Sequence, residues 1–246
     1  MKIQYASDLH LEFADNWRYL REHPLEIAGD ILVLAGDIGY LGDENYSKHP
    51  FWDWASENFK QVLVVPGNHE FYKFYDIATL KDGFTLEIRP NVHAYCNKVV
   101  RIGDTDLILT TLWLKIEPKD AFSTERCITE FHRISSNGQL LTADDFNAEH
   151  ERCFNFLKKS VEESDARHKM VVTHHVPSFT LLSPEFKDSA LNGAFTVELG
   201  NFIADSDIDV WIYGHSHRNI NAVIGRTRCI SNQLGYLFHN EHHDFD

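Results

Sequence analysis

The sequence predicts an α/β fold in which buried strands present polar side chains at one edge of a sheet. Short aliphatic runs recur along the chain, and such runs are typical of strands covered on both faces. Longer stretches whose apolar residues follow a helical spacing lie between them, notably 51–59 and 142–163. Five of the aliphatic runs end in residues of the kind that bind metals. Together these observations favour an α/β domain whose loops form a site.

Each of the five strands leads into a short motif rich in aspartate, asparagine or histidine. The motifs are Asp8-Leu9-His10, Gly36-Asp37, Gly67-Asn68-His69-Glu70, His174-His175 and Gly214-His215-Ser216-His217. In open α/β sheets ligands bind beyond the carboxyl ends of the strands, because the loops there face a common crevice. We therefore expect the five motifs to meet at one site.

The other elements follow from local composition and turn signals. Residues 12–22 are mixed polar and aromatic, which predicts a loop and a short helix. Thr142 is a suitable N-cap for a helix that runs to about Glu163. Gly103-Asp104 and Gly225 predict the turns of two hairpins. The remaining predicted elements are strands at 92–96, 98–102, 106–112, 220–224 and 227–230 and a helix at 196–205.

Two longer segments carry little periodicity. Residues 115–140 are polar and rich in turn signals, with a helical piece near Phe131, and residues 178–193 hold several apolar side chains. Because segments of this length inside a compact domain are usually functional, we expect both to form a rim or lid. No internal repeat, low-complexity tract or linker interrupts the sequence, which predicts a single domain over residues 1–246.

Charge and composition exclude several classes of function. The net charge is -14 and Lys and Arg do not cluster along the sequence, so we expect no general nucleic-acid binding. No apolar run approaches the ~20 residues that span a bilayer. The N-terminus lacks the pattern of a secretory signal. The four cysteines are scattered, which suits reduced thiols, so we expect a cytoplasmic protein without membrane contact.

Seven side chains form the candidate metal-binding set. They are Asp8, His10, Asp37, Asn68, His174, His215 and His217. Oxygen and imidazole ligands without a thiolate suit divalent Mn, Fe, Zn or Ni and argue against a structural zinc site. Asp-x-His and His-x-His place alternate side chains on one side of an extended loop, so both members can face the same site. Seven groups are too many for one tetrahedral ion and suit two ions that share a carboxylate.

Two neighbouring residues have more than one interpretation. His175 would support a ligand or contact substrate, or else be a satisfied core histidine. Glu70 would orient a ligand or cap the turn that follows it. Any one of the motifs alone is a weak signal, since an isolated Gly-Asp is usually just a turn. The occurrence of all five in one chain is what favours a dinuclear site.

In this order, the five motifs resemble the signature of the calcineurin-like metallophosphoesterases, and they span positions 8 to 217. The resemblance implies a sandwich of two mixed β-sheets flanked by helices. It also implies catalytic roles for Asn68 and His69, in which His69 protonates the leaving oxygen. The implied ligands are Asp8, His10, Asp37 and His217 for one metal ion, and Asn68, His174 and His215 for a second ion to which Asp37 is the bridge.

Departures from relatives narrow the subclass that the resemblance implies. Protein Ser/Thr phosphatases carry Gly-Asp-x-x-Asp-Arg-Gly and an arginine before Gly-Asn-His-Glu. This chain has Tyr40 at the position of the second aspartate and Pro66 at the position of that arginine. A protein-phosphatase role is therefore disfavoured. The sequence looks more like the small bacterial phosphoesterases, which include cyclic-nucleotide-type phosphodiesterases.

The resemblance thus implies a hydrolase that cleaves a phosphate ester by attack of a hydroxide bridging two cations. A phosphodiester of a small molecule or nucleotide is the favoured substrate, and a phosphomonoester of a small metabolite is the alternative. The expected partner is accordingly a small phosphorylated molecule. A non-catalytic metal-binding scaffold would have at least one damaged ligand motif, and none is damaged here.

Selectivity between esters is expected from the two longer segments. Residues 130–134 resemble an Asp-aromatic-Arg-x-Ile element of some bacterial relatives, and Arg133 would supply a bidentate phosphate contact. Phe179 and Phe186 would stack on a flat leaving group or pack the rim. We therefore expect Arg133, Phe179 and His175 to lie at the substrate rim.

Overall fold

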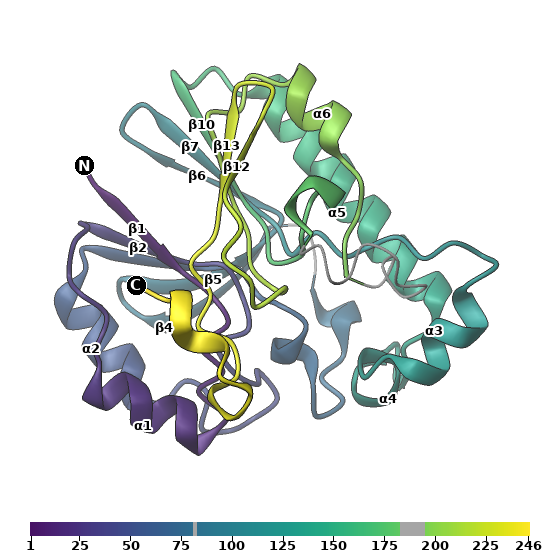
Figure 1. The fold of residues 1–246 in the computed structure, drawn as a ribbon, viewed down its shortest axis with the longest axis horizontal. Coiled ribbons are helices and arrows are strands. Elements are labelled where there is room, and N and C mark those ends of the chain that lie inside the picture. Colours follow the sequence, from purple (N-terminus) through teal and green to yellow (C-terminus); the bar gives the residue numbers. More distant parts are fainter. Residues whose placement is uncertain (81–82, 183–194) are drawn as a thin grey trace.

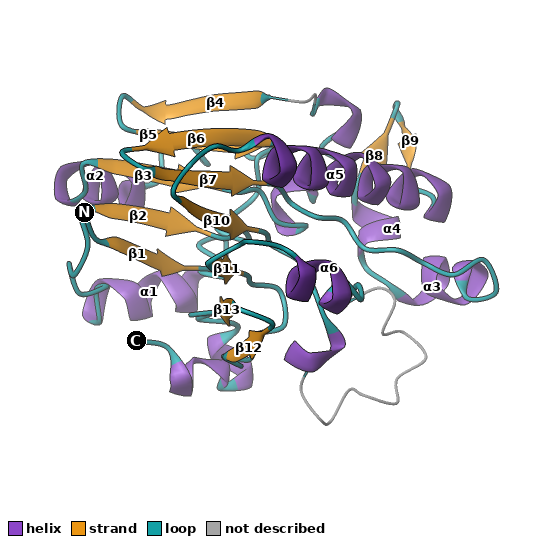
Figure 2. Ribbon diagram, turned by 90° about the horizontal axis from the view of Figure 1, so that it is seen from above, coloured by secondary structure: helices purple, strands orange, loops and turns teal. Residues whose placement is uncertain are grey.

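Two β-sheets pack face to face in the computed structural model, with helices on the outer face of each (Figures 1 and 2). The structure describes residues 1–80, 83–182 and 195–246. The sandwich of two mixed sheets flanked by helices, which the family resemblance implied, is confirmed. The arrangement places three apolar layers in the molecule, one between the sheets and one beneath each set of helices.

The first sheet has the order β1-β2-β3-β5-β4, in which β4 alone is antiparallel to its neighbour. Its strands are β1 Ile3–Ala6, β2 Ile31–Leu34, β3 Gln61–Val64, β4 Phe84–Arg89 and β5 Val92–Cys96. Three of the predicted ligand motifs follow β1, β2 and β3. Sequence reasoning missed β4, because half of this edge strand faces solvent and it lacks the continuous apolar run of the others.

The second sheet has the order β12-β13-β11-β10-β7-β6, with antiparallel strands at both edges. Its strands are β6 Lys98–Ile102, β7 Thr105–Leu109, β10 His168–Val172, β11 Val210–Ile212, β12 Ala222–Ile224 and β13 Thr227–Ile230. The other two motifs follow β10 and β11. The chain passes from the first sheet to the second at Asn97, whose φ of 50° turns it sharply between β5 and β6.

The strands direct alternate side chains into different layers. Val33 and Leu63 of the first sheet meet Leu109 of the second in the layer between the sheets. Leu32 and Leu34, on the opposite face, pack in the layer that α1 and α2 cover. Because both sheets are buried on both faces, their central strands stay rigid, and the loops at their carboxyl ends are held in place.

The helices cover the two outer faces (Figure 1). They are α1 Ala14–Glu22, α2 Pro50–Asn58, α3 Ala121–Cys127, α4 Glu130–Arg133, α5 Ala143–Glu163 and α6 Gly200–Asp205. The predicted N-cap of α5 is confirmed: the Asp145 amide donates to Thr142 Oγ1 at 3.2 Å, and the Thr142 amide donates to Asp145 Oδ2 at 3.1 Å. This reciprocal pair is a capping box.

The predicted rim segments differ in how far the structure describes them. Residues 115–140 contain α3, α4 and a small hairpin of β8 Ser135–Ser136 and β9 Gln139–Leu140, and they extend beyond the sheets on the right of Figure 1. Of the segment 178–193, residues 178–182 are described and include a 3₁₀ helix at Phe179–Leu181. Phe186 and the rest of that segment lie outside the described residues.

Several predicted boundaries shift by a few residues. β5 and β6 match the predicted strands at 92–96 and 98–102, whereas β7 ends at Leu109 instead of 112. The chain leaves the sheet there and turns at Leu112, where φ is 52°. α6 covers only the second half of the predicted helix at 196–205, since Thr196 pairs with Val176 in an isolated bridge.

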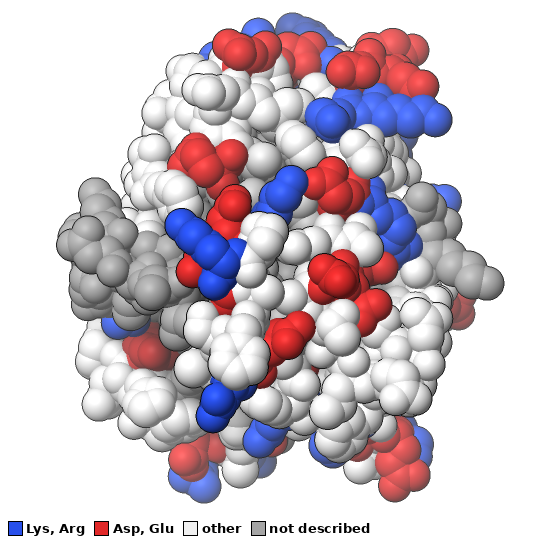
Figure 3. Space-filling model, turned by 90° about the vertical axis from the view of Figure 1, so that its right-hand side faces the viewer, with Lys and Arg blue, Asp and Glu red and all other residues white. Residues whose placement is uncertain are grey.

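On the face drawn in Figure 3, the described Lys and Arg side chains are interspersed with Asp and Glu. Among residues 1–80, 83–182 and 195–246, no helix is both long enough and apolar enough to cross a membrane.

Candidate metal centre

The backbone bends sharply at most of the predicted ligand residues. Five of the seven have a positive φ, between 48° and 73°: Asp8, His10, Asp37, His215 and His217. Such values are uncommon for residues other than glycine and cluster at functional sites, because the surrounding structure must hold them. The sharp bends turn side chains from separate strand ends toward one another.

Asp8, His10, Asp37 and His217 form the first group, and their ligand atoms all lie within 4.8 Å of one another. His10 Nε2 is 3.0 Å from His217 Nε2, and His217 Nε2 is 3.3 Å from Asp8 Oδ1. Asp37 Oδ2 is 3.9 Å from His10 Nε2. All four side chains are largely buried, so they face one another and not bulk water.

Asn68, His174 and His215 form the second group. Asn68 Oδ1 lies 2.8 Å from His174 Nε2 and 3.1 Å from His215 Nδ1. Asp37 Oδ1 lies 3.4 Å from His174 Nε2, while its other oxygen faces His10 of the first group. Asp37 therefore stands between the two groups, where the family resemblance placed a bridging ligand.

The residues present fit divalent cations. The donor set is carboxylate, amide oxygen and imidazole, which suits first-row transition ions and contains no thiolate. His10 Nε2 and His217 Nε2 face each other at 3.0 Å, so both nitrogens point at the same space. In the second group, His215 Nδ1 and His174 Nε2 likewise face each other at 3.2 Å. The number and identity of ions that these groups would hold remain predictions.

Burial sets the protonation of the cluster. It raises the pKa of Asp37 well above its usual range, and the nearby carboxylates Glu70 and Asp8 raise it further. Burial also lowers the pKa of His10 and of His174, each to about 4. The imidazoles of His10 and His174 are thus held neutral, with a lone pair available, while the carboxylates repel one another. A bound cation would offset that repulsion.

His217 differs from the other imidazoles. Burial lowers its pKa, but hydrogen bonds to Asp8 and to Glu241 outweigh that effect and raise the pKa to about 9. Glu241 Oε2 lies 2.6 Å from His217 Nδ1, so this carboxylate fixes the ring with Nε2 toward the candidate site. Glu241 was not identified from the sequence, because it lies in none of the five motifs.

Glu70 connects two of the ligand loops. Its Oε2 accepts from the amides of Asp37 and Gly67 at 2.9 and 2.6 Å, and its Oε1 accepts from Ile38 and Gly39 at 2.8 and 3.2 Å. Of the two interpretations of Glu70, the structure therefore supports orientation of a ligand loop. Gly67 is required beside it, because a Cβ there would lie 2.2 Å from Asp37 Oδ1.

His69 lies next to the cluster between two polar partners. Its Nδ1 is 2.7 Å from Glu12 Oε1, and its Nε2 is 3.0 Å from the Tyr236 hydroxyl. The amide of His69 donates to Asp37 Oδ1 at 2.8 Å, which ties its position to the candidate bridge. Sequence reasoning missed Glu12, although Asp8, His10 and Glu12 alternate along the loop and so could face the same side.

Two further residues support Asn68 and were not identified from the sequence. Glu130 Oε1 accepts from Asn68 Nδ2 at 2.7 Å, and it also accepts from the Tyr72 hydroxyl at 3.3 Å. Because the amide nitrogen is engaged, Asn68 Oδ1 faces His174 and His215.

His175 is buried, with Nδ1 3.3 Å from Thr111 O, and its ring packs against Trp113 and His215.

A cavity of about 440 Å³ opens over the cluster. The lining residues include Asp37, Asn68, His69, His215, His217 and Tyr236 from the site, and Ile128, Val176, Leu182 and Phe195 from its apolar wall. Arg133 and Phe179 are not among the residues that line it. The Arg133 guanidinium lies over the Tyr72 ring, 5.7 Å from its centroid. Their assignment to the substrate rim stays a prediction.

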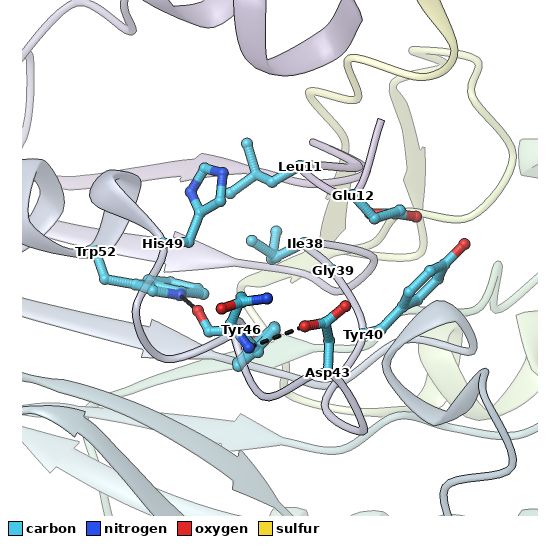
Figure 4. A pocket seen from close by; sticks show the side chains of 10 residues that line it. Leu11, Glu12, Ile38, Gly39, Tyr40, Asp43, Tyr46, His49 and Trp52 are labelled. Atoms are coloured by element: carbon cyan, nitrogen blue, oxygen red, sulfur yellow. Dashed lines mark hydrogen bonds between the residues drawn. The ribbon is translucent and has the colours of Figure 1, made fainter. Parts of the chain in front are cut away.

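Glu12 is also one of the residues that line a smaller pocket of about 160 Å³ (Figure 4). The lining of this pocket includes Leu11, Ile38, Tyr46 and Trp52, and the Trp52 indole donates to Tyr46 O at 2.6 Å. His10 and His69, which Glu12 Oε1 contacts, are not among its lining residues.

Known proteins are similar to this chain over most of its length. The uncharacterized protein L509 of Acanthamoeba polyphaga mimivirus is 28% identical over 261 residues, covering 95% of this chain and 91% of that protein. The crystal structure of phosphopantetheinyl hydrolase (PptH) from Mycobacterium tuberculosis superposes with a TM-score of 0.66 at 17% identity, covering 96% of this chain and 89% of that one. The structure of TT1561 from Thermus thermophilus gives a TM-score of 0.52 at 12% identity, covering 94% and 88%.

The two structural likenesses, at such low identity, establish a shared fold. A family model for calcineurin-like phosphoesterases matches residues 1–219, which include all five ligand motifs. Members of this family are phosphoester hydrolases that depend on divalent metals, and the described His and Asp groups could hold such ions. The chain therefore belongs to the calcineurin-like phosphoesterase family.

Proposed function

We propose that this protein is a phosphodiesterase that uses two divalent cations to hydrolyse an ester of a small molecule or nucleotide. The observation that carries the proposal is the position of Asp37, whose two oxygens face separate groups of nitrogen and oxygen donors beneath one cavity. When bound, such a pair of cations lowers the pKa of a water ligand and offsets charge on the phosphate oxygens.

The chain's own residues would orient the substrate and handle the leaving group. His69 is within reach of the cavity and its Nδ1 is held by Glu12. When the ring also carries a proton on Nε2, it is placed to give that proton to the oxygen that leaves phosphorus. Asn68 is fixed by Glu130, which keeps its carbonyl oxygen toward the ligand groups. The apolar wall of the cavity excludes water and strengthens these polar contacts.

The apolar side of the cavity favours a diester over a monoester. A diester carries a second ester substituent that a monoester lacks, and burying that substituent against apolar side chains is favourable. The wall of Ile128, Val176, Leu182 and Phe195 gives the second ester substituent an apolar surface.

A substrate panel tests the proposal. The protein would be stripped of metal, reconstituted with Mn, Fe, Zn or Ni, and assayed with bis-p-nitrophenyl phosphate, p-nitrophenyl phosphate and 2′,3′- and 3′,5′-cyclic nucleotides. Asp37→Ala serves as the matched variant, because it removes the shared carboxylate from the same site. We expect metal-dependent hydrolysis with higher kcat/KM for diesters, and at least ~10²-fold less in Asp37→Ala.

Two results would overturn parts of the proposal. A higher kcat/KM for p-nitrophenyl phosphate than for the diester would replace the diesterase with the monoesterase alternative. Absence of hydrolysis with every metal and every ester, in protein shown to have bound the ions, would favour the non-catalytic scaffold.

A further inference from the structure

The C-terminal segment beyond β13 lies against the loop that carries Asp8. The Ser7 amide donates to Asn232 O at 2.9 Å, and the amides of Leu234 and Gly235 donate to Ser7 O and Asp8 O, each at 3.1 Å. This backbone pairing runs directly beside the first group of candidate ligands. The segment itself follows residues 1–219, which the family model matches, whereas Ser7 and Asp8 lie within them.

The segment turns at Gly235 and places Tyr236 over the site. Gly235 has a φ of 69°, and a Cβ at this position would lie 2.8 Å from Glu241 and 3.1 Å from His217. The Tyr236 amide donates to Glu241 Oε2 at 2.7 Å. The Tyr236 ring is then 4.5 Å from the His217 ring and 4.6 Å from the His10 ring, centroid to centroid.

The Tyr236 hydroxyl is directed toward His69. The Tyr236 hydroxyl and His69 Nε2 are 3.0 Å apart, while His69 Nδ1 lies 2.7 Å from Glu12. An ionised carboxylate can only accept, so His69 Nδ1 donates to Glu12. When the ring carries no second proton, its Nε2 accepts from the phenol. Burial raises the pKa of Tyr236 above its usual range, so the hydroxyl is a neutral donor. Both rings line the cavity over the cluster.

We propose that Tyr236 is a further catalytic residue of the phosphoester hydrolysis proposed above, and this inference rests on that function. Its hydroxyl donates to an oxygen of the bound phosphate ester at the side of His69. In the resting protein the hydroxyl is paired with His69 Nε2, and an anionic phosphate oxygen is a stronger acceptor than a neutral imidazole. The contact is a hydrogen bond alone, so Tyr236 transfers no proton and the balance of the reaction is unchanged.

Tyr236→Phe removes the hydroxyl and keeps the ring. Tyr40→Phe is the matched comparator, because the Tyr40 ring also stacks on His69, at 6.0 Å, while its hydroxyl interacts with Arg133. With the zinc-reconstituted protein we expect Tyr236→Phe to lower kcat/KM for bis-p-nitrophenyl phosphate by about 10- to 100-fold. We expect bound zinc to stay at the wild-type level, and Tyr40→Phe to lose less than about threefold.

Phosphate binding can be measured without turnover, and one such measurement uses the wild-type protein alone. In wild-type protein labelled with ¹³C at the tyrosine ζ carbon, inorganic phosphate added to the zinc-loaded form should shift the Tyr236 resonance. Isothermal titration should show inorganic phosphate binding at least about tenfold more weakly to Tyr236→Phe. A wild type that binds phosphate through Tyr236 but hydrolyses no ester would contradict the proposed function and leave the Tyr236 contact standing.

Other results would overturn the Tyr236 proposal and leave the proposed function standing. If wild type hydrolyses the diester while Tyr236→Phe matches its kcat/KM and phosphate affinity, the hydroxyl does not touch the substrate. An unmoved Tyr236 resonance at saturating phosphate would have the same meaning. The hydroxyl would then serve only to pair with His69 in the resting protein.

Discussion

Glu12 Oε1 lies 2.7 Å from His69 Nδ1, and the same oxygen lies 3.1 Å from His10 Nδ1. One buried carboxylate oxygen therefore accepts from two imidazole rings that face the site. The carboxylate holds a proton on Nδ1 of both rings, so that each Nε2 points away from Glu12 and, in His69, can carry the second proton that is donated. His10 Nε2 is directed at the candidate metal ligands, and His69 Nε2 at the cavity.

Replacing Glu12 should impair the reaction through His69 and His10. In Glu12→Leu neither ring has its acceptor, so we expect kcat to fall by about 10- to 100-fold and metal affinity to weaken as well. Glu12→Gln retains an acceptor oxygen without the charge and should lose less. Steady-state assays and competition with a chelator measure the two effects. Equal losses in the leucine and glutamine variants would contradict an orienting role.

His69 should affect the chemistry more than the retention of metal. His69→Asn removes the group that protonates the leaving oxygen, so kcat should fall by about 10²-fold or more for an unactivated ester. The loss should be smaller for a p-nitrophenyl ester, because that leaving group scarcely needs a proton. Elemental analysis should find metal content near that of wild type. Equal losses on activated and unactivated esters would count against the general-acid role.

The shared position of Asp37 predicts a change in stoichiometry. Elemental analysis of reconstituted wild type should find about two ions per chain, and Asp37→Ala should find about one or fewer. Asp43→Ala serves as the control. Asp43 is about a third exposed, lies in the loop that follows Asp37 and pairs with Lys73, so this variant should bind as many ions as wild type. About one ion in wild type, or an unchanged count in Asp37→Ala, would contradict the dinuclear interpretation.

The ligand groups could be predicted from the sequence because their signals are local. Each candidate ligand follows a buried parallel strand within a few residues, and strands of that kind direct their loops to one edge. The structure accordingly brings all seven predicted side chains into two adjoining groups. The N-cap at Thr142 was predictable for the same reason, since a capping box needs only four consecutive residues.

The supporting carboxylates could not be predicted, because their partners are distant in sequence. Glu12 and His69 are 57 positions apart, and Asn68 and Glu130 are 62 apart. Nothing in the local composition around these glutamates separates them from solvated charges, and only the folded arrangement of loops selects them. Glu241 was missed for the same reason, since it meets His217 only after the chain has turned at Gly235.

The rim prediction remains open to a direct test. Arg133 lies over Tyr72, which lines the cavity, and Phe179 is 44% exposed beside the apolar wall residue Leu182. Arg133→Ala and Phe179→Ala should change the ranking of substrates by about tenfold, equivalent to ~1.4 kcal/mol. Val223→Ala, an exposed apolar truncation on β12, is the control. If both variants scale every substrate by one common factor, these residues do not select the substrate.

His150 should make the stability of the metal-free protein depend on pH. The ring is buried, Nδ1 donates to Trp113 O at 2.5 Å, and burial lowers its pKa below the ordinary value of 6.5. The unfolded chain then takes up a proton near pH 6.5 while the folded chain does not, so the stability present above that pH is lost as pH falls below it.

The variant His150→Gln tests this, because it keeps a donor for Trp113 but has no proton to gain. Urea unfolding from about pH 7.5 to 5.5 should therefore show wild type losing stability relative to the variant, because the other titrating groups are common to both. A difference in unfolding free energy that stays constant with pH would mean that His150 does not titrate on unfolding.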